Sequence, residues 1–153
     1  PEPQPLLSQA PMILGLDGSQ KMSKSRNNAV MLSATEDETA ALIKKAKTDA
    51  ERLITYEPTR RPEVANLLLL VSLATGKAPE AIAAEIGEGG AGKLKATLTE
   101  ALNEYLRPLR ARRGELEANP DYIRDVLRAG VAEARAVASA TLDEVREAMH
   151  MTI

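Results

Sequence analysis

Residues 61–76 read Arg-Pro-Glu-Val-Ala-Asn-Leu-Leu-Leu-Leu-Val-Ser-Leu-Ala-Thr-Gly. Pro62 suits the first position of a helix, where a missing backbone N–H costs nothing, and Gly76 is a typical stop. The interior, 64–71, is apolar almost all round, so we expect this helix to lie deep in a core rather than on a surface. The stretch therefore predicts a helical fold organised around one buried helix.

Two further helices are expected, one on each side of this stretch. Upstream, Ser33–Glu36 and Thr35–Glu38 each fit a capping box, which opens a helix that runs to about Lys47. Downstream, Pro79 opens a short helix that Gly87 ends.

The carboxy-terminal half predicts two longer helices. Apolar residues first fall on one helical face, and Pro108 is expected to kink or end that helix. Asn119-Pro120 then caps a last helix with an apolar stripe. The first face consists of Leu94, Leu98, Leu102, Leu106 and Leu109. The stripe consists of Ile123, Leu127, Val131, Ala134, Ala138, Leu142, Val145 and Met149.

The amino-terminal segment has a different character. It is proline-rich to about Pro11, and the run Met12–Leu14, ended by Gly15, predicts a short buried strand. The segment 17–28, called the lysine loop below, carries turn residues and no apolar periodicity, so we expect an exposed loop. The chain should thus be mainly α, with a strand and a loop that lead into a bundle of helices.

Composition excludes several classes of function. The 153 residues carry 20 basic and 22 acidic side chains, a net charge of −2, so the chain lacks the cationic surplus of a general nucleic-acid coat. There is no cysteine and His150 is the sole histidine, which excludes disulfides, thiolate metal sites and multi-histidine metal sites. No apolar run approaches the roughly 20 residues that cross a bilayer. These features predict a soluble cytoplasmic protein without a membrane partner.

The lysine loop carries the clearest chemistry. Lys21 and Lys24 stand three positions apart and can address one group of negative charge, while the hydroxyls of Ser23 and Ser25 can donate to phosphate oxygens. Gly18 before the lysines and 27–28 after them would permit the loop to move. A solvated surface loop with ordinary lysines is the alternative.

The string Lys-Met-Ser-Lys-Ser at 21–25 is the KMSKS signature of class I aminoacyl-tRNA synthetases, which form an aminoacyl-adenylate from amino acid and ATP. The surrounding sequence resembles the tryptophanyl-tRNA synthetases from Met12 onward. The matching segments are 15–18, 47–49, 54–56, 61–68, 106–109 and 137–139.

The resemblance implies roles for individual residues. Lys21 and Lys24 would be catalytic, contacting the ATP phosphates and stabilising the leaving pyrophosphate. Met12 and Met22 would lie against adenine, and the two serines would shape the loop. The residues that would contact the nucleotide are Met12, Lys21, Met22, Ser23, Lys24 and Ser25. The implied cofactors are ATP and Mg²⁺, the metal being held largely by phosphates.

The resemblance also implies the architecture and the partners. The whole enzyme would combine an α/β Rossmann domain with a helical domain. Residues 1–30 would be the end of the catalytic domain, with a remnant Rossmann strand, and 31–153 the helical domain that binds the anticodon of tRNA(Trp). The full enzyme would be a homodimer that takes tryptophan in its amino-terminal half.

Two features indicate that the sequence is part of a longer enzyme. No His-Ile-Gly-His-type element is present, and the chain begins Pro1-Glu2 without an initiator methionine. We therefore expect that this polypeptide alone does not charge tRNA. The alternatives are a tyrosyl-tRNA synthetase-like ligase, a noncatalytic tRNA-binding module derived from a synthetase, or a plain helical bundle.

Two other patterns favour structural interpretations. Residues 87–93 fit half of a P-loop, but Leu94 replaces the Ser or Thr that holds magnesium and no strand precedes it, so a flexible helix–helix link is expected. Arg107, Arg110, Arg112 and Arg113 form a basic cluster. It is interpreted as a solvated helix end, with tRNA phosphates as the alternative partner.

Overall fold

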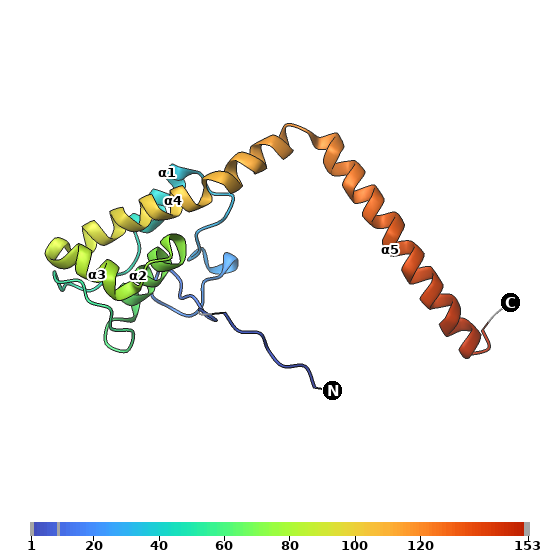
Figure 1. Cartoon of the computed structure of the whole chain (residues 1–153), viewed down its shortest axis with the longest axis horizontal. Coiled ribbons are helices and arrows are strands. Elements are labelled where there is room, and N and C mark those ends of the chain that lie inside the picture. Colours follow the sequence, from blue (N-terminus) through green and yellow to red (C-terminus); the bar gives the residue numbers. More distant parts are fainter. Residues whose placement is uncertain (1, 9, 152–153) are drawn as a thin grey trace. The chain divides into compact units, whose positions relative to one another are not determined.

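The computed structural model describes residues 2–8 and 10–151, and within them the fold is helical (Figure 1). Two compact units are present, Pro1–Arg110 and Ala111–Ile153. The elements are η1 (Lys24–Arg26), α1 (Glu36–Lys44), α2 (Pro62–Thr75), α3 (Pro79–Ile86), η2 (Gly87–Gly89), α4 (Gly90–Glu117) and α5 (Pro120–Ala148).

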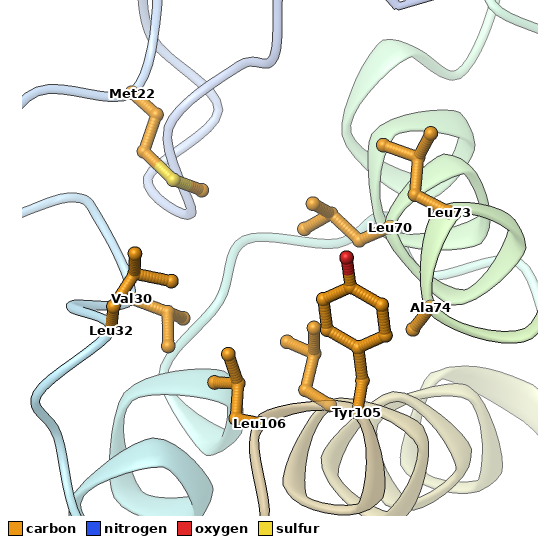
Figure 2. A pocket seen from close by; sticks show the side chains of 9 residues that line it. Met22, Val30, Leu32, Leu70, Leu73, Ala74, Tyr105 and Leu106 are labelled. Carbon is orange, nitrogen blue, oxygen red and sulfur yellow. The ribbon is translucent and has the colours of Figure 1, made fainter. Parts of the chain in front are cut away.

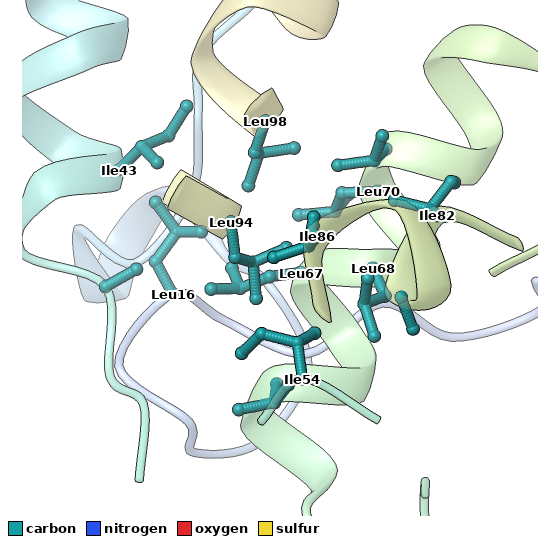
Figure 3. Packing of buried hydrophobic residues seen from close by; sticks show 14 residues of the cluster. Leu16, Ile43, Ile54, Leu67, Leu68, Leu70, Ile82, Ile86, Leu94 and Leu98 are labelled. Atoms are coloured by element: carbon teal, nitrogen blue, oxygen red, sulfur yellow. The ribbon is translucent and has the colours of Figure 1, made fainter. Parts of the chain in front are cut away.

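Helix α2 lies at the centre of the first unit. Its residues Val64, Leu67, Leu68 and Val71 are at most 1% exposed. Helix α3 packs against α2, and α1 and α4 complete the cluster. In Figure 3, Ile43 of α1, Ile82 and Ile86 of α3, and Leu94 and Leu98 of α4 surround the α2 leucines. The prediction of a helix buried on nearly every side is confirmed.

The predicted helix boundaries hold where local chemistry sets them. Thr35 and Glu38 form the capping box of α1. Pro62 begins α2, and Gly76 ends it in the left-handed conformation at φ 75°. Helix α1 ends at Lys44, short of the predicted Lys47, because the Lys47 N–H donates to the Leu16 carbonyl at 2.7 Å and draws the chain out of the helix.

Helix α4 departs from the prediction at both ends. It begins at Gly90, inside the glycine-rich stretch, so that the link from α3 is only the short turn η2. It also continues through Pro108 to Glu117. Proline lacks a backbone N–H and so removes one i→i−4 hydrogen bond. That loss does not by itself end a helix whose remaining backbone hydrogen bonds form.

The predicted strand at Met12–Leu14 is not formed. Among the described residues, this segment makes one isolated antiparallel bridge, between Leu14 and Lys21, and Met12 is 61% exposed. The other backbone edge of Leu14 is occupied by the side chain of Asn66, so no neighbouring strand is needed to satisfy its peptide groups.

The second unit comprises the end of α4 and the helix α5. The side chain of Asn119 accepts a hydrogen bond from the Tyr122 N–H and so caps α5, as expected from Asn119-Pro120. Within the second unit no α5 side chain is buried, so the predicted apolar stripe lies on an exposed helix face there. Within the first unit, residues of α1 to α4 form the helical core.

No single helix of the described chain has the length and apolar content to cross a membrane. One bent pair, Pro62–Thr75 with Pro79–Glu117, meets the criterion jointly across a 110° bend, by length and composition only.

Candidate functional site

The lysine loop rises from a short backbone hairpin. The Met22 N–H donates to the Ile13 carbonyl at 2.8 Å, and the Gly15 N–H donates to the Gln20 carbonyl at 3.1 Å. Gly18 adopts φ 72° in the turn between them, a conformation that side-chain-bearing residues rarely adopt. The hairpin brings Lys21 next to Leu14 and so ties the loop to the folded unit.

The buried side chain of Asn66 holds one side of this hairpin. Its Oδ1 accepts from the Leu14 N–H at 3.0 Å, and its Nδ2 donates to the Leu14 carbonyl at 3.0 Å. Because Asn66 belongs to α2, the central helix of the core, Leu14 is fixed relative to that core. These two bonds make Asn66 a polar residue of the core whose side chain is fully engaged with the backbone of Leu14.

A second amide, that of Asn28, holds the other side of the loop. Asn28 is 3% exposed; its Oδ1 accepts from the Ser23 N–H at 2.8 Å and its Nδ2 donates to Asp17 Oδ1 at 3.1 Å. Its backbone carbonyl accepts from the Leu16 N–H at 2.9 Å. The three bonds make Asn28 an anchor of the loop, a role that the sequence did not indicate.

Gly15 provides the space for Asn28. A Cβ at this position would lie 2.0 Å from Asn28 Nδ2 and 2.5 Å from Asp17 Oδ1. Both atoms belong to the hydrogen-bonded pair, so no side chain at Gly15 is compatible with it. The sequence indicates only a strand end here and does not reveal this close approach.

Asp17 closes the loop at its amino-terminal side. Its Oδ1 accepts from the Ser19 N–H at 3.1 Å, and both carboxylate oxygens accept from the Ser19 hydroxyl at 2.9 Å. The Ser19 backbone bond, followed by those of the Ser19 hydroxyl and Asn28, holds the pKa of Asp17 below its ordinary value despite partial desolvation. Asp17 therefore remains an ionised acceptor at neutral pH.

The tip of the loop is a short turn that carries the second lysine. Residues Lys24–Arg26 form the 3₁₀ turn η1, and Asn27 follows it at φ 52°. The hydroxyls of Ser23 and Ser25 lie 3.0 Å apart and share a hydrogen bond. The tip is therefore held by its own turn and hydroxyl bond, in addition to the bond between Asn28 and Ser23.

Both lysines of the loop are exposed, and neither makes an ion pair or a side-chain hydrogen bond within the described part of the chain. Other lysines differ: Lys47 lies 2.9 Å from Glu63, and Lys77 lies 2.9 Å from Glu85. The charges of Lys21 and Lys24 are consequently not neutralised by the fold.

The two methionines assigned to adenine line different hollows. Met22 borders a cavity of about 350 Å³, which Figure 2 shows between the loop and the side chains of Leu73 and Tyr105. Met12 borders a smaller hollow of about 130 Å³ that includes Tyr56. The structure brings Lys21, Met22, Ser23, Lys24 and Ser25 together, whereas Met12 lies across the hairpin from them.

A buried ion pair supports the amino-terminal end of α2. Arg61 is 3% exposed and binds Asp49 through two bonds of 2.7 Å, and it also donates to the Leu53 carbonyl and the Thr55 hydroxyl. The hydrogen bonds of Arg61 hold the pKa of Asp49 below its ordinary value. The contact between Asp49 and Arg61 depends on the course of the loop between them and is not visible in the sequence.

The basic cluster divides into two kinds of arginine. Arg110 donates to the Ala34 carbonyl at 2.8 Å and to the Thr39 hydroxyl at 2.8 Å, so it ties α4 to α1. The others form exposed ion pairs along the helix: Arg107 with Glu104, Arg112 with Glu115 and Arg113 with Glu117. The expected helix end is wrong, because the last turn of α4 contains no basic residue.

The P-loop-like stretch 87–93 has a structural role. Lys93 donates to the Glu85 carbonyl at 3.1 Å, where it caps the end of α3, instead of facing an open phosphate cradle. The expected helix–helix link is limited to the turn η2, because residues 90–93 already belong to α4.

Comparison with known proteins gives consistent results. The family model of class I tRNA synthetases for tryptophan and tyrosine (W and Y) matches residues 1–107. A tryptophan–tRNA ligase from Thermosynechococcus vestitus is 39% identical over 156 residues, covering 99% of this chain and 47% of that protein. One from Gloeobacter violaceus is 37% identical over 137 residues, covering 87% of this chain and 40% of that protein.

A solved structure also matches. Tryptophanyl-tRNA synthetase from Campylobacter jejuni, in complex with ADP and tryptophan, superposes with a TM-score of 0.73 at 25% identity, covering 91% of this chain and 43% of that one. The chain spans about half the length of the curated relatives it matches. The resemblance stated from the sequence is confirmed: the chain belongs to the class I tRNA synthetase family of the tryptophan and tyrosine enzymes.

Proposed function

We propose that this chain supplies the phosphate loop and the helical tRNA-binding part of a tryptophan–tRNA ligase. The observation that carries the proposal is the pair Lys21 and Lys24, whose charges the described fold leaves without a carboxylate partner on a loop anchored at its base. The likeness to ligases named for tryptophan supports the choice of amino acid.

The reaction proceeds in two steps. A carboxylate oxygen of tryptophan bonds to the α-phosphorus of ATP, and the bond from that phosphorus to the β-phosphate oxygen breaks to release pyrophosphate. A ribose hydroxyl of tRNA(Trp) then attacks the activated carbonyl and releases AMP. Negative charge grows on the pyrophosphate oxygens in the first step, and Lys21 and Lys24 stabilise it electrostatically.

The remaining contacts are assigned to the same loop. Ser23 and Ser25, already linked through their hydroxyls, shape the tip and donate to phosphate oxygens. Met22 lies against the adenine, and Met12 reaches it from the other side of the hairpin. The ADP in the Campylobacter jejuni enzyme supports nucleotide binding by this fold.

Magnesium would enter with ATP. The described residues gather no group of three or more His, Cys, Asp or Glu side chains able to hold a metal ion, so they do not fit a resident metal site. We therefore assign the ion to the phosphates and no step of the reaction to it.

The further assignments follow from the proposed identity. Residues 1–30 are the end of the catalytic domain, and 31–153 form the domain that binds the anticodon end of tRNA(Trp). Tryptophan is bound by the other half of the enzyme, the full enzyme acts as a homodimer, and it works in the cytoplasm.

A chimera tests the proposal. The matching segment of the Thermosynechococcus vestitus ligase is replaced by this chain, and tryptophan-dependent exchange of pyrophosphate into ATP is measured. We expect exchange by the chimera and none by the ligase truncated of that segment. A folded chimera that binds tryptophan but exchanges no pyrophosphate would contradict the proposal.

The isolated chain is the complementary test. Without the other half it should show no tryptophan-dependent exchange above that of a Lys21→Gln/Lys24→Gln variant. The noncatalytic alternative predicts that the isolated chain binds tRNA(Trp) in a salt-dependent manner while the chimera remains inactive.

A further inference from the structure

One buried side chain joins the three parts of the lysine loop. Asn28 accepts from the Ser23 N–H at 2.8 Å, in the middle of the KMSKS string, and donates to Asp17 at 3.1 Å, before the string. Its own backbone follows the string and accepts from the Leu16 N–H at 2.9 Å. The start, the middle and the end of the loop therefore meet at a single amide.

The chemistry of this position admits few substitutes. The Ser23 bond requires an acceptor and the Asp17 bond requires a donor, and an asparagine side chain offers both within one short amide. Aspartate has no donor when ionised, and leucine has neither group. Gly15 adds a spatial limit, since a Cβ there would lie 2.0 Å from Asn28 Nδ2.

We propose that Asn28 is the positioning residue of the lysine loop, fixing Ser23 relative to Asp17 so that Lys21 and Lys24 are presented at one place on the first unit. Among the described residues, Asn28 makes no hydrogen bond to either lysine side chain, and it acts through the Ser23 backbone. The relevance of this role to catalysis rests on the proposed function, whereas the role in holding the loop does not.

The first test uses the chain itself. Amide hydrogen exchange is followed by NMR at Ser23 and, as a reference in the core, at Ile82 of α3, whose N–H donates to the Ala78 carbonyl at 3.2 Å. Asn28→Ala should accelerate exchange at Ser23 by about tenfold or more, the cost of one lost hydrogen bond, and leave Ile82 unchanged. Asn27→Gly is the matched control, because Asn27 is the exposed neighbour at φ 52° and glycine adopts that conformation freely.

A second variant provides a signature that a general loss of packing would not give. Asn28→Asp keeps the acceptor for Ser23 but places a carboxylate where Asn28 Nδ2 now lies, 3.1 Å from Asp17 Oδ1. Near neutral pH the two ionised carboxylates repel each other, whereas in mild acid one of them binds a proton and can donate it to the other. Protection of Ser23, relative to Ile82, should therefore be lost near neutral pH and recovered in mild acid.

The side chains at positions 17 and 28 can also be exchanged. In the double variant Asn28→Asp/Asp17→Asn, the side chain at position 17 can donate to the carboxylate at position 28 only by giving up its bond from the Ser19 N–H, so protection of Ser23 at neutral pH should return in part. Unchanged exchange at Ser23 in Asn28→Ala would overturn the proposal, as would equal acceleration at Ser23 and Ile82. A pH-independent Asn28→Asp variant with no recovery in the double variant would also overturn it.

The catalytic consequence is measured separately in the chimera. Asn28→Ala should lower kcat for pyrophosphate exchange by about tenfold to a hundredfold, as expected for misplaced catalytic groups, with the KM for tryptophan unchanged. If the unsubstituted chimera is inactive, the proposed function fails while the exchange data still decide the role of Asn28. If the chimera is active and Asn28→Ala leaves its kcat unchanged, the positioning role fails alone.

Discussion

Arg61 shows how single side chains support the site from a distance. It is buried at the start of α2 and donates four hydrogen bonds to three residues: two to Asp49, one to the Leu53 carbonyl and one to the Thr55 hydroxyl. These bonds satisfy a charge that would otherwise be costly to bury. They also fix the loop ahead of α2, the helix whose Asn66 holds Leu14 and the hairpin.

We expect Asp49→Ala to lower the free energy of unfolding by about 3 kcal/mol, because it leaves the buried guanidinium of Arg61 without its carboxylate. Urea denaturation of the chain measures this. The control is Glu51→Ala: Glu51 lies farther from Arg61, at 3.6 Å, and pairs mainly with the exposed Arg60, so a small change is expected. Equal effects of the two substitutions would refute the role given to Arg61.

The same pair should make stability depend on acid pH. The folded-state pKa of Asp49 lies below its ordinary value of 3.8, so in the window between them the unfolded chain binds more protons and stability rises with pH. The contribution is fully present above that ordinary value and is lost as the pH falls through the folded-state pKa. Asp49→Asn should therefore flatten the acid limb of a plot of unfolding free energy against pH. An unchanged limb would show that Asp49 does not supply it.

At the scale of elements, the two long helices differ in what their apolar residues do. Leu98 of α4 is 0% exposed and belongs to the core, whereas Leu127 of α5 is 62% exposed. Both come from regular apolar patterns of similar appearance in the sequence. Periodicity thus reports that a helix has an apolar face, and not whether that face is covered within the chain.

This contrast gives a matched pair of substitutions. Leu98→Ala should cost about 2–5 kcal/mol of unfolding free energy, since it leaves a cavity in a packed core. Leu127→Ala should change the stability by less than about 0.5 kcal/mol, as for most exposed positions. Both values come from chemical denaturation of the chain. A large loss from Leu127→Ala would mean that α5 is packed in solution.

The elements also show how far sequence reasoning reaches. Proline and glycine marked the bounds of α2 and α3, and Thr35 with Glu38 marked the start of α1, because these signals act within a few residues. The lysine loop was recognisable for the same reason. Its anchors, Asn28 and Asn66, were not, since their partners depend on tertiary placement. Of the two effects expected of Pro108, the end of the helix is wrong, because a helix tolerates one missing donor when its other bonds form.

At the scale of the whole molecule, the chain covers less than half of the relatives it matches, and its net charge is −2. Binding of tRNA would therefore rest on local groups of arginine and lysine rather than on overall charge. Within the basic cluster, the exposed arginines of α4 that pair with glutamates are the candidates for contact with tRNA phosphates. Arg110 is not a candidate, because its guanidinium is hydrogen-bonded within the first unit.

We expect the isolated chain to bind tRNA(Trp) weakly, with an association constant that falls as salt rises because counterions are released from phosphates. Arg107→Gln/Arg112→Gln/Arg113→Gln should weaken binding and reduce the salt slope without unfolding the chain. Filter binding or fluorescence titration at several salt concentrations measures both. Binding that is strong and independent of salt would be inconsistent with contacts to phosphate.

The measurement that tests the central claim most directly is pyrophosphate exchange by the chimera carrying single lysine substitutions. Lys21→Gln and Lys24→Gln should each lower kcat by about a hundredfold, because each removes a charge that stabilises the leaving pyrophosphate. Lys77→Gln, at an exposed lysine paired with Glu85, should leave the rate unchanged. Equal rates for all three variants and the unsubstituted chimera would show that the lysine loop is not a phosphate site.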